Sequence, residues 1–204
     1  MGGPPAHGSM VASGWTDQES ESGASMAMWI ALLRAVNVGG RPFPMARLRE
    51  ILTDAGYADV ATHIQTGNVR FGSPARSATR LAAMLEELFL ADRGFPVATF
   101  VLTPGELSAI AADAARVAAR HTPSVGHYVS VLDAPPTGAD ARRIEDLSRD
   151  RERVVVAGRA VHLLYDLPYH EARTSNAAIE RIVGRATNRN ARVIAALAAK
   201  WGAG

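Results

Sequence analysis

An apolar run that ends in residues suited to holding an anion is the first feature with chemical potential. Residues 30–33 read Ile-Ala-Leu-Leu, and Arg34, Asn37, Gly39 and Gly40 follow. An arginine at the end of a buried strand can bind a carboxylate or phosphate through two parallel hydrogen bonds. Glycines let backbone N–H groups approach an anion closely. These four residues are therefore candidates for a small-anion site, although the glycines and Asn37 could simply make a turn while Arg34 pairs with an internal acid.

Two further groups of polar residues are candidates for ligand binding. Gln65 and Asn68 flank a predicted hairpin turn, where polar residues also occur without any ligand. Thr187 or Asn188 is a predicted N-cap, which would place Arg189 in the first turn of the last helix beside Asn190. A cation at the N-terminus of a helix interacts unfavourably with the helix dipole unless an anion compensates its charge. This mismatch adds Thr187, Arg189 and Asn190 to the candidate ligand-binding residues.

Several classes of chemistry find no support in the sequence. The chain has no Cys, so thiolate nucleophiles, disulfides and iron–sulfur clusters are excluded. The six histidines show no metal-ligand spacing, and no nucleophile elbow, Rossmann fingerprint or Walker motif occurs. The single lysine, Lys200, lies beside the C-terminus. We therefore expect no metal and no cofactor, and no residue is assigned a catalytic role.

The elements that must position these residues alternate in a regular order in the first half. We predict an apolar strand over residues 29–36, an amphipathic helix over 44–56 and a hairpin over 60–71. A second helix over 78–90 and a further strand over 97–102 follow. The order β-α-β-β-α-β is the ferredoxin-like arrangement. In that arrangement we expect Arg34, at the end of the first strand, to lie at the opposite end of the sheet from the hairpin turn.

The hairpin is predicted to turn at Gly67-Asn68, a pair that tolerates positive φ. A two-residue turn pairs Ile64 with Phe71 and places both on the face that the helices cover. His63 and Arg70 then project from the other face. A binding cleft between the two halves of the chain would use that second face.

The second half repeats much of this order. A helix over 106–119 leads to a strand, a helix, a hairpin and a helix over 128–132, 139–147, 153–165 and 177–183, and a last helix spans about 190–201. No clear final strand is predicted. We expect an α+β fold with two ferredoxin-like (alpha-beta plait) subdomains, each with an antiparallel sheet, plus a C-terminal helix. The predicted bounds are 28–103 and 104–204, after a Gly-, Ser- and Pro-rich disordered extension over 1–27.

Three segments resemble the bacterial family known as domain of unknown function 1697. They are residues 30–40, residues 64–68, which read Ile-Gln-Thr-Gly-Asn, and residues 186–190, which read Ala-Thr-Asn-Arg-Asn. Ala191 stands where the family usually has Trp, and residues 174–176 replace a Ser-Lys-Leu segment. The resemblance implies a duplicated ferredoxin-like fold and a bacterial source, and it brings no agreed substrate or reaction.

Three functions are compatible with these patterns. The first is binding of a small anion in a cleft between the halves through Arg34 and Arg189. The second is a protein-interaction or dimerisation module. The third is non-specific nucleic-acid binding through the basic C-terminal helices, since six bases outnumber two acids between His170 and Gly204. Whether the protein is an enzyme stays open at this point.

Length and composition limit the class of protein that the chain can be. With 204 residues, of which 48% are hydrophobic, the chain can bury a sizeable core, and its net charge is only +2. No apolar run reaches the roughly 20 residues that a membrane-spanning helix needs. We therefore expect a cytoplasmic protein with no membrane contact.

Overall fold

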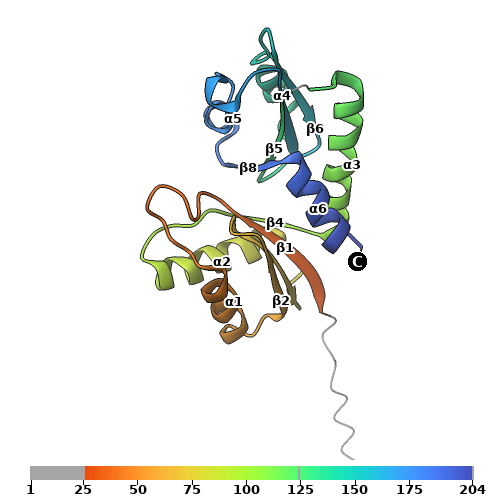
Figure 1. The fold of residues 1–204 in the computed structure, drawn as a ribbon. Coiled ribbons are helices and arrows are strands. Elements are labelled where there is room, and N and C mark those ends of the chain that lie inside the picture. Colours follow the sequence, from red (N-terminus) through yellow and green to blue (C-terminus); the bar gives the residue numbers. More distant parts are fainter. Residues whose placement is uncertain (1–25, 124, 204) are drawn as a thin grey trace, which may run out of the picture.

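The computed structural model describes residues 26–123 and 125–203, and it contains two four-stranded antiparallel sheets (Figure 1). The first half comprises β1 (Ala27–Leu33), α1 (Met45–Asp54), β2 (Ala58–His63), β3 (Asn68–Ser73), α2 (Ala78–Arg93) and β4 (Thr99–Leu102). The second half comprises β5 (Gly126–Leu132), α4 (Gly138–Glu145), β6 (Glu152–Ala157), β7 (Ala160–Tyr165), a short 3-10 helix (Tyr169–Glu171), α5 (Asn176–Val183) and β8 (Ala186–Asn190). Helix α3 (Pro104–His121) joins the halves, and α6 (Ala191–Trp201) follows β8.

The strand orders are β2-β3-β1-β4 and β6-β7-β5-β8, so each half has the same ferredoxin-like topology. The predicted α+β fold with two such subdomains is confirmed. The predicted disordered extension falls mainly on residues 1–25, which lie outside the described residues. Within the described part of the chain, none of the helices has the length and apolar character that crossing a bilayer requires.

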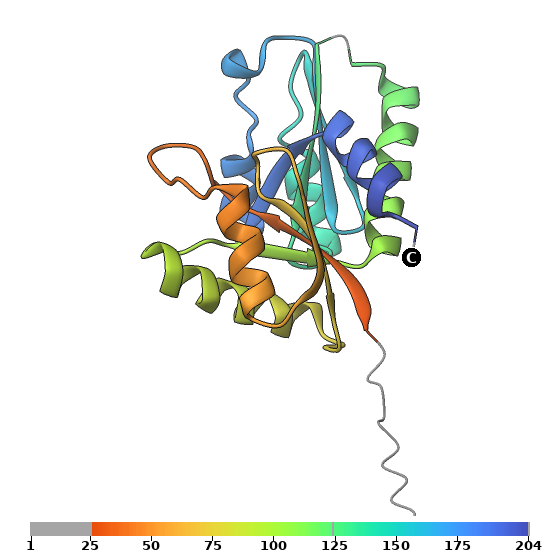
Figure 2. The same cartoon turned by 60° about the horizontal axis from the view of Figure 1, so that its bottom comes forward.

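Strand β1 has two buried faces that belong to different cores. Trp29, Ala31 and Leu33 pack under α1 and α2, on the side of the sheet away from the second half (Figures 1 and 2). Ile30 and Leu32 alternate with them and face the second half. This is the pattern predicted from a continuously apolar run, because alternate side chains of a strand point to opposite faces.

Two helices that the ferredoxin-like unit lacks contribute to the core between the halves. Helices α3 and α6 lie side by side in Figures 1 and 2, and Ile110 and Leu197 join Phe100 of β4 and Val129 of β5 in one buried cluster. Thr103 and Glu106 set the start of α3 with reciprocal side-chain to backbone hydrogen bonds, a capping box. The open faces of both sheets are therefore covered, and the halves share apolar packing.

The hairpin register differs from the prediction. His63 pairs with Asn68, so the loop comprises the four residues 64–67, and Ile64 is 46% exposed rather than under the helices. The buried Asn68 side chain explains the wider loop, because its Nδ2 donates to the carbonyl of His63 at 3.1 Å and to Oγ1 of Thr66 at 2.8 Å. Phe71 does lie under the helices, as predicted.

A final strand exists where none was clear from the sequence. Strand β8 pairs with β5, with Thr187 opposite Val131 and Arg189 opposite Val129. Arg189 is therefore not in the last helix, and Thr187 is not its N-cap. That role belongs to Asn190, whose Oδ1 accepts a hydrogen bond from the backbone N–H of Arg192 at 2.9 Å. Four of the five residues of β8 are polar. They lacked a strand pattern because neighbours from distant segments, rather than apolar alternation, bury Thr187 and Arg189.

A buried histidine pair lies in the second sheet. Nε2 of His127 is 3.2 Å from Nδ1 of His162, and His162 is fully buried with no hydrogen-bond partner for its Nε2 among the described residues. Burial, with a smaller contribution from His127, lowers the pKa of His162 to about 4. Burial also lowers the pKa of His127. Both rings are therefore neutral at pH 7.

We expect this pair to make the protein acid-sensitive. Between pH 6.5 and pH 5 the unfolded chain takes up a proton at this position while the folded protein does not, so stability falls as the pH decreases. The expected loss is about 2 kcal/mol of unfolding free energy over that window. Urea titrations at both pH values would measure it. The loss should shrink in His162→Leu and persist in His170→Gln, a change at an exposed histidine; equal pH dependence in wild type and His162→Leu would contradict the assignment.

Candidate functional site

The three motif segments meet at one junction between the halves. Because β1 and β3 are antiparallel, the end of β1 lies beside the start of β3, with Leu32 opposite Asn68. The backbone N–H of Leu33 donates to the carbonyl of Gly67 at 2.8 Å. The expectation that Arg34 and the hairpin turn lie at opposite ends of the sheet was therefore wrong. Antiparallel pairing with the third strand forces them together.

Arg189 extends from β8 into this junction and uses all of its donor groups there. Its Nε donates to Oδ1 of Asn68 at 2.7 Å, and its Nη2 donates to the carbonyls of Leu33 at 2.8 Å and Thr66 at 2.9 Å. Further acceptors are Oγ1 of Thr187, the carbonyl of Asn188 and the carbonyl of Gly67. One guanidinium thus ties the last strand of the second half to two strand ends of the first.

The Arg189 guanidinium is buried without a carboxylate partner among the described residues. The residue is 8% exposed, and every acceptor is a neutral oxygen. Burial lowers its pKa to about 10, still far above neutral pH, so the side chain is charged. A fully engaged, enclosed guanidinium has no donor left for a ligand. The role that its contacts support is holding the two halves together.

Arg34 makes a second connection across the junction. Its Nη2 lies 2.6 Å from Oε2 of Glu180 on α5, and its Nε donates to the carbonyl of Ala186 at 3.1 Å. Asn176 donates to the same carbonyl at 3.1 Å. The alternative stated for Arg34, pairing with an internal acid, is therefore the arrangement observed.

Asn37 and the two glycines form the turn after β1. Oδ1 of Asn37 accepts from the backbone N–H of Phe43 at 2.7 Å, and its Nδ2 donates to the carbonyl of Gln65 at 2.8 Å. Gly39 and Gly40 have φ of 57° and 77° at the exposed tip of this loop. Of the candidates, the structure brings Arg34, Asn37, Gln65, Asn68, Thr187 and Arg189 together, leaves the glycines at the loop tip, and uses Asn190 to cap α6.

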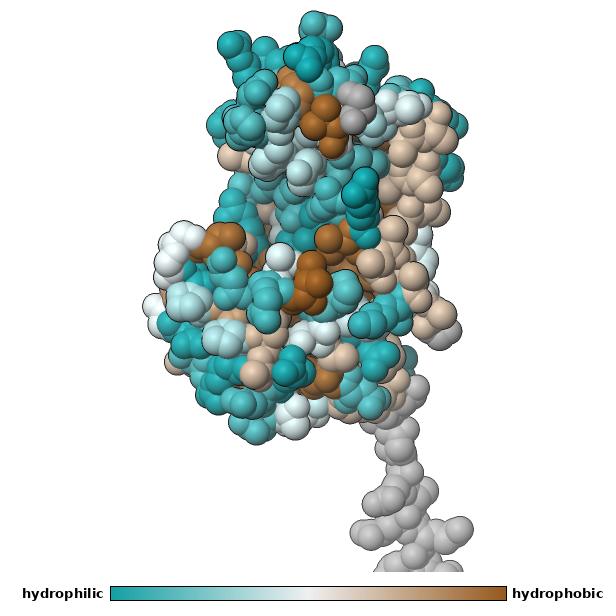
Figure 3. All heavy atoms as spheres, viewed as in Figure 1, coloured by the Kyte–Doolittle hydropathy of each residue, from teal (hydrophilic) through white to brown (hydrophobic). Residues whose placement is uncertain are grey.

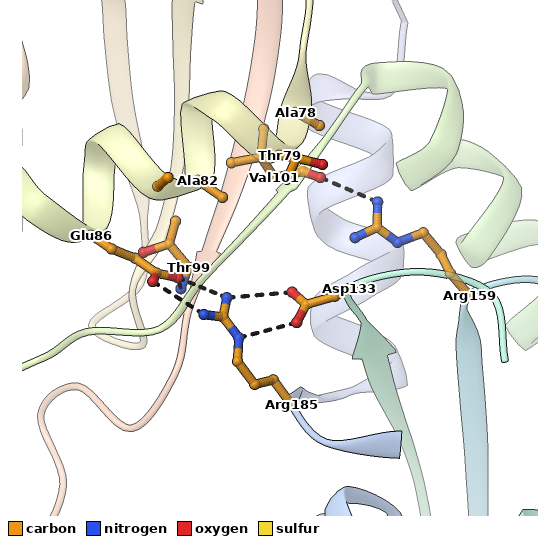
Figure 4. A pocket seen from close by; sticks show the side chains of 10 residues that line it. Ala78, Thr79, Ala82, Glu86, Thr99, Val101, Asp133, Arg159 and Arg185 are labelled. Carbon is orange, nitrogen blue, oxygen red and sulfur yellow. Dashed lines mark hydrogen bonds and ion pairs between the residues drawn. The ribbon is translucent and has the colours of Figure 1, made fainter.

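A groove between the halves contains charged residues that sequence reasoning missed (Figure 4). It has a volume of about 290 Å³ and lies between α2 and β4 on one side and the second sheet on the other. Its charged lining residues are Glu86, Asp133, Arg159 and Arg185. The sequence gives only a weak signal for this groove. The signal consists of three alanines on one flank of α2, Ala78, Ala82 and Ala83, and alanine is favourable in any helix.

Arg185 is the centre of this groove. Its Nη1 and Nη2 bond both carboxylate oxygens of Glu86 at 3.1 and 2.7 Å, and its Nε lies 3.0 Å from Oδ2 of Asp133 (Figure 4). Hydrogen bonding to Glu86, reinforced by the charge of Asp133, raises the pKa of Arg185. The arginine side chain is nevertheless 44% exposed, and that of Asp133 is 52% exposed. Unlike Arg189, this guanidinium can be reached from solvent.

Arg159 completes the groove from the other side. Its Nη1 donates to the carbonyl of Val101 at 3.3 Å and to Oε1 of Glu106 at 3.1 Å, and its Nε donates to the carbonyl of Leu132 at 2.9 Å. It thereby links β4 and α3 to the second sheet. The guanidinium is 14% exposed and belongs to the wall of the groove.

The basic C-terminal segment is less available to nucleic acid than its composition suggests. Arg185 and Arg189 are engaged inside the protein as described above. Of the exposed bases that remain, Arg181 lies on α5, and Arg192 and Lys200 lie near opposite ends of α6. Nothing in this arrangement favours the nucleic-acid alternative over small-ligand binding.

Comparison with known proteins supports the family and the fold. A family profile described as "Protein of unknown function (DUF1697)" matches residues 26–162. The solved structure of the conserved bacterial protein SP0830 from Streptococcus pneumoniae is similar, with a TM-score of 0.66 and 18% sequence identity over 87% of this chain and 99% of that one. At that identity the likeness shows the fold alone. The comparison with curated proteins gave no match.

Proposed function

The chain belongs to the DUF1697 family of proteins of unknown function, and because that membership carries no activity, we propose from the geometry that it binds a small ligand bearing a carboxylate or phosphate in the groove between its halves. Arg185 is the proposed anchor, in place of Arg34 and Arg189, whose contacts hold the junction. The ligand's anionic group would take the place that Asp133 occupies beside the guanidinium.

The observation that carries this proposal is the state of Arg185. Its planar group is already held by two carboxylates, one from each half, in the geometry that arginine uses to bind carboxylate and phosphate. One of those carboxylates, Asp133, is more than half exposed. An exposed ion pair contributes at most about 1 kcal/mol, so a ligand anion with further contacts can replace it.

The surroundings of Arg185 leave room for the rest of a ligand. Ala78, Ala82 and Ala83 form a small-residue wall on α2. A second hollow of about 390 Å³, lined in part by Leu90 and Val97, also reaches Glu86 and Arg185. The ion pair between these two residues thus borders both hollows. A ligand bound to Arg185 could extend into either.

Two substitutions test the site in opposite directions. We expect Arg185→Gln to weaken binding of its anionic ligand roughly 10- to 150-fold, because a charge-assisted contact of about 1.5 to 3 kcal/mol is lost. Asp133→Asn should strengthen binding roughly two- to fivefold, because the competing carboxylate is gone. Isothermal titration calorimetry of the full chain against monocarboxylates, dicarboxylates, sugar phosphates and nucleoside monophosphates would identify the ligand class and measure both effects.

Matched variants control for net charge. Arg181→Gln removes an exposed arginine on α5, and Asp54→Asn removes an exposed aspartate at the end of α1. Both should leave binding unchanged. The proposal fails if no compound in the panel binds, or if Arg185→Gln and Arg181→Gln affect binding equally.

A further inference from the structure

A separate hollow lies between α3, α6 and the start of β5, away from the groove. Its volume is about 440 Å³, and no residue that lines it also lines the groove. The chemistry-bearing residues in its lining are His127, Asn190 and Arg192. None of the motif segments predicted this hollow, apart from Asn190 at the end of β8.

The wall of this hollow is apolar and made of small residues. Ala111, Ala114, Ala115 and Ala118 line it from α3, and Ala195 lines it from α6. Figure 3 shows the corresponding pale brown band over α3 and α6 at the right-hand edge of the molecule. Short side chains keep two packed helices from filling the space between them. The hollow can therefore take an apolar group of moderate size.

The charge in the hollow is entirely positive. No Asp or Glu lines it, and Arg192 makes no ion pair within residues 26–123 and 125–203. Arg192 stands in the first turn of α6, which contains no acid. A cation there is opposed by the helix dipole. The unfavourable placement of a cation at the start of the last helix, which was predicted for Arg189, is therefore found at Arg192. No acid in the described part of the protein compensates the charge of Arg192.

His127 supplies a hydrogen-bonding group in the lining of the hollow. Its Nε2 is committed to His162, at 3.2 Å, which leaves Nδ1 as the ring nitrogen outside that contact. His162 is fully buried behind it, so the pair holds the His127 ring in place. A fixed imidazole and an unpaired guanidinium at one apolar hollow are the elements of an anion site.

We propose that this hollow is a second binding site, which takes a carboxylate or phosphate attached to an apolar body. Arg192 supplies the opposing charge, His127 supplies a hydrogen bond, and the alanines of α3 and α6 contact the apolar part. The groove at Arg185 is not required for this site, because the two share no residue.

The probes are phenyl phosphate, benzoate and inorganic phosphate, titrated into the full chain by calorimetry and followed by amide NMR shifts. We expect at least one aromatic probe to bind roughly tenfold more tightly than inorganic phosphate, because the hollow buries the ring. The NMR shifts should centre on β5 and the start of α6. Preference for phenyl phosphate or for benzoate distinguishes a phosphate site from a carboxylate site.

Variants separate this site from the groove. Arg192→Gln should weaken the aromatic probe roughly tenfold or more, whereas Lys200→Gln on the same helix should not. Ala195→Phe should block the hollow, whereas Ala196→Phe, at the adjacent residue that does not line it, should leave it open. Arg185→Gln can affect only probe bound in the groove, so it should leave the NMR shifts at β5 and the start of α6 unchanged. Absence of those shifts, equal shifts in the Arg192→Gln variant and wild type, or their loss in Arg185→Gln would overturn the proposal.

Discussion

Replacing Arg189 with leucine is expected to lower the free energy of unfolding by about 3 to 5 kcal/mol, because buried oxygen acceptors lose the guanidinium that donates to them. Leucine cannot donate, so the carbonyl of Leu33 and Oδ1 of Asn68 would lose this buried donor, whereas the carbonyl of Gly67 keeps the backbone N–H of Leu33. Each unsatisfied buried acceptor costs roughly 1 to 3 kcal/mol. Urea denaturation of the variant and wild type would measure the difference.

Two further variants sharpen this test. Arg181→Leu makes the same change at an exposed arginine and should cost less than about 0.5 kcal/mol. Arg189→Lys should recover only part of the loss, because a compact ammonium cannot reproduce the planar fork that reaches Asn68 and Leu33 together. If Arg189→Leu were as stable as Arg181→Leu, the junction would not depend on the guanidinium.

Gly67→Ala is the second substitution with a large expected effect, at about 2 to 4 kcal/mol, the sum of a backbone cost and a steric one. Gly67 has φ of 69°, where a side chain costs roughly 1 to 2 kcal/mol. A Cβ at this position would also lie 2.6 Å from Cγ2 of Val36 and 2.8 Å from Cβ of Leu33. Both neighbours are buried, so relieving the clash requires moving the end of β1.

Gly158→Ala separates the two costs. Gly158 also has positive φ, 55°, but a Cβ there would meet nothing within 4 Å. We therefore expect only the backbone cost, roughly 1 to 2 kcal/mol. Thermal or urea unfolding of both variants gives the contribution of the close approach by difference. Equal losses in the two variants would mean that the hairpin loop moves freely away from β1.

The local sequence pattern was sufficient to predict structure where the environment of a segment depends on its own residues. The continuous apolar run of β1 predicted two buried faces, and Trp29 and Ile30 indeed enter different cores. Leu81, Leu85 and Phe89 recur at helical spacing in the sequence, and they form the buried side of α2. Because periodicity reports directly on which side of an element is buried, the element order, and with it the duplicated fold, followed from the sequence.

The local sequence pattern did not predict structure where burial depends on residues that are distant in the chain. Strand β8 lacks apolar alternation, and Thr187 and Arg189 are buried because they face the first half of the chain. The hairpin loop is set by the buried amide of Asn68 rather than by turn preference. In both cases polar groups are satisfied by tertiary hydrogen bonds, and the sequence of the segment does not contain its partner.

The sequence by itself determined the elements other than β8, their order, the family and the residues that matter at the junction. Only the tertiary structure decided what those residues do: Arg189 and Asn68 bond across 121 positions of the chain, and Arg185 and Glu86 across 99. The first pair is enclosed and holds the halves together, whereas the second is open to solvent in a groove. Arg189 and Arg185 are the same residue type. Their burial and their acceptors distinguish a structural contact from a candidate binding site, and both depend on how the two sheets pack.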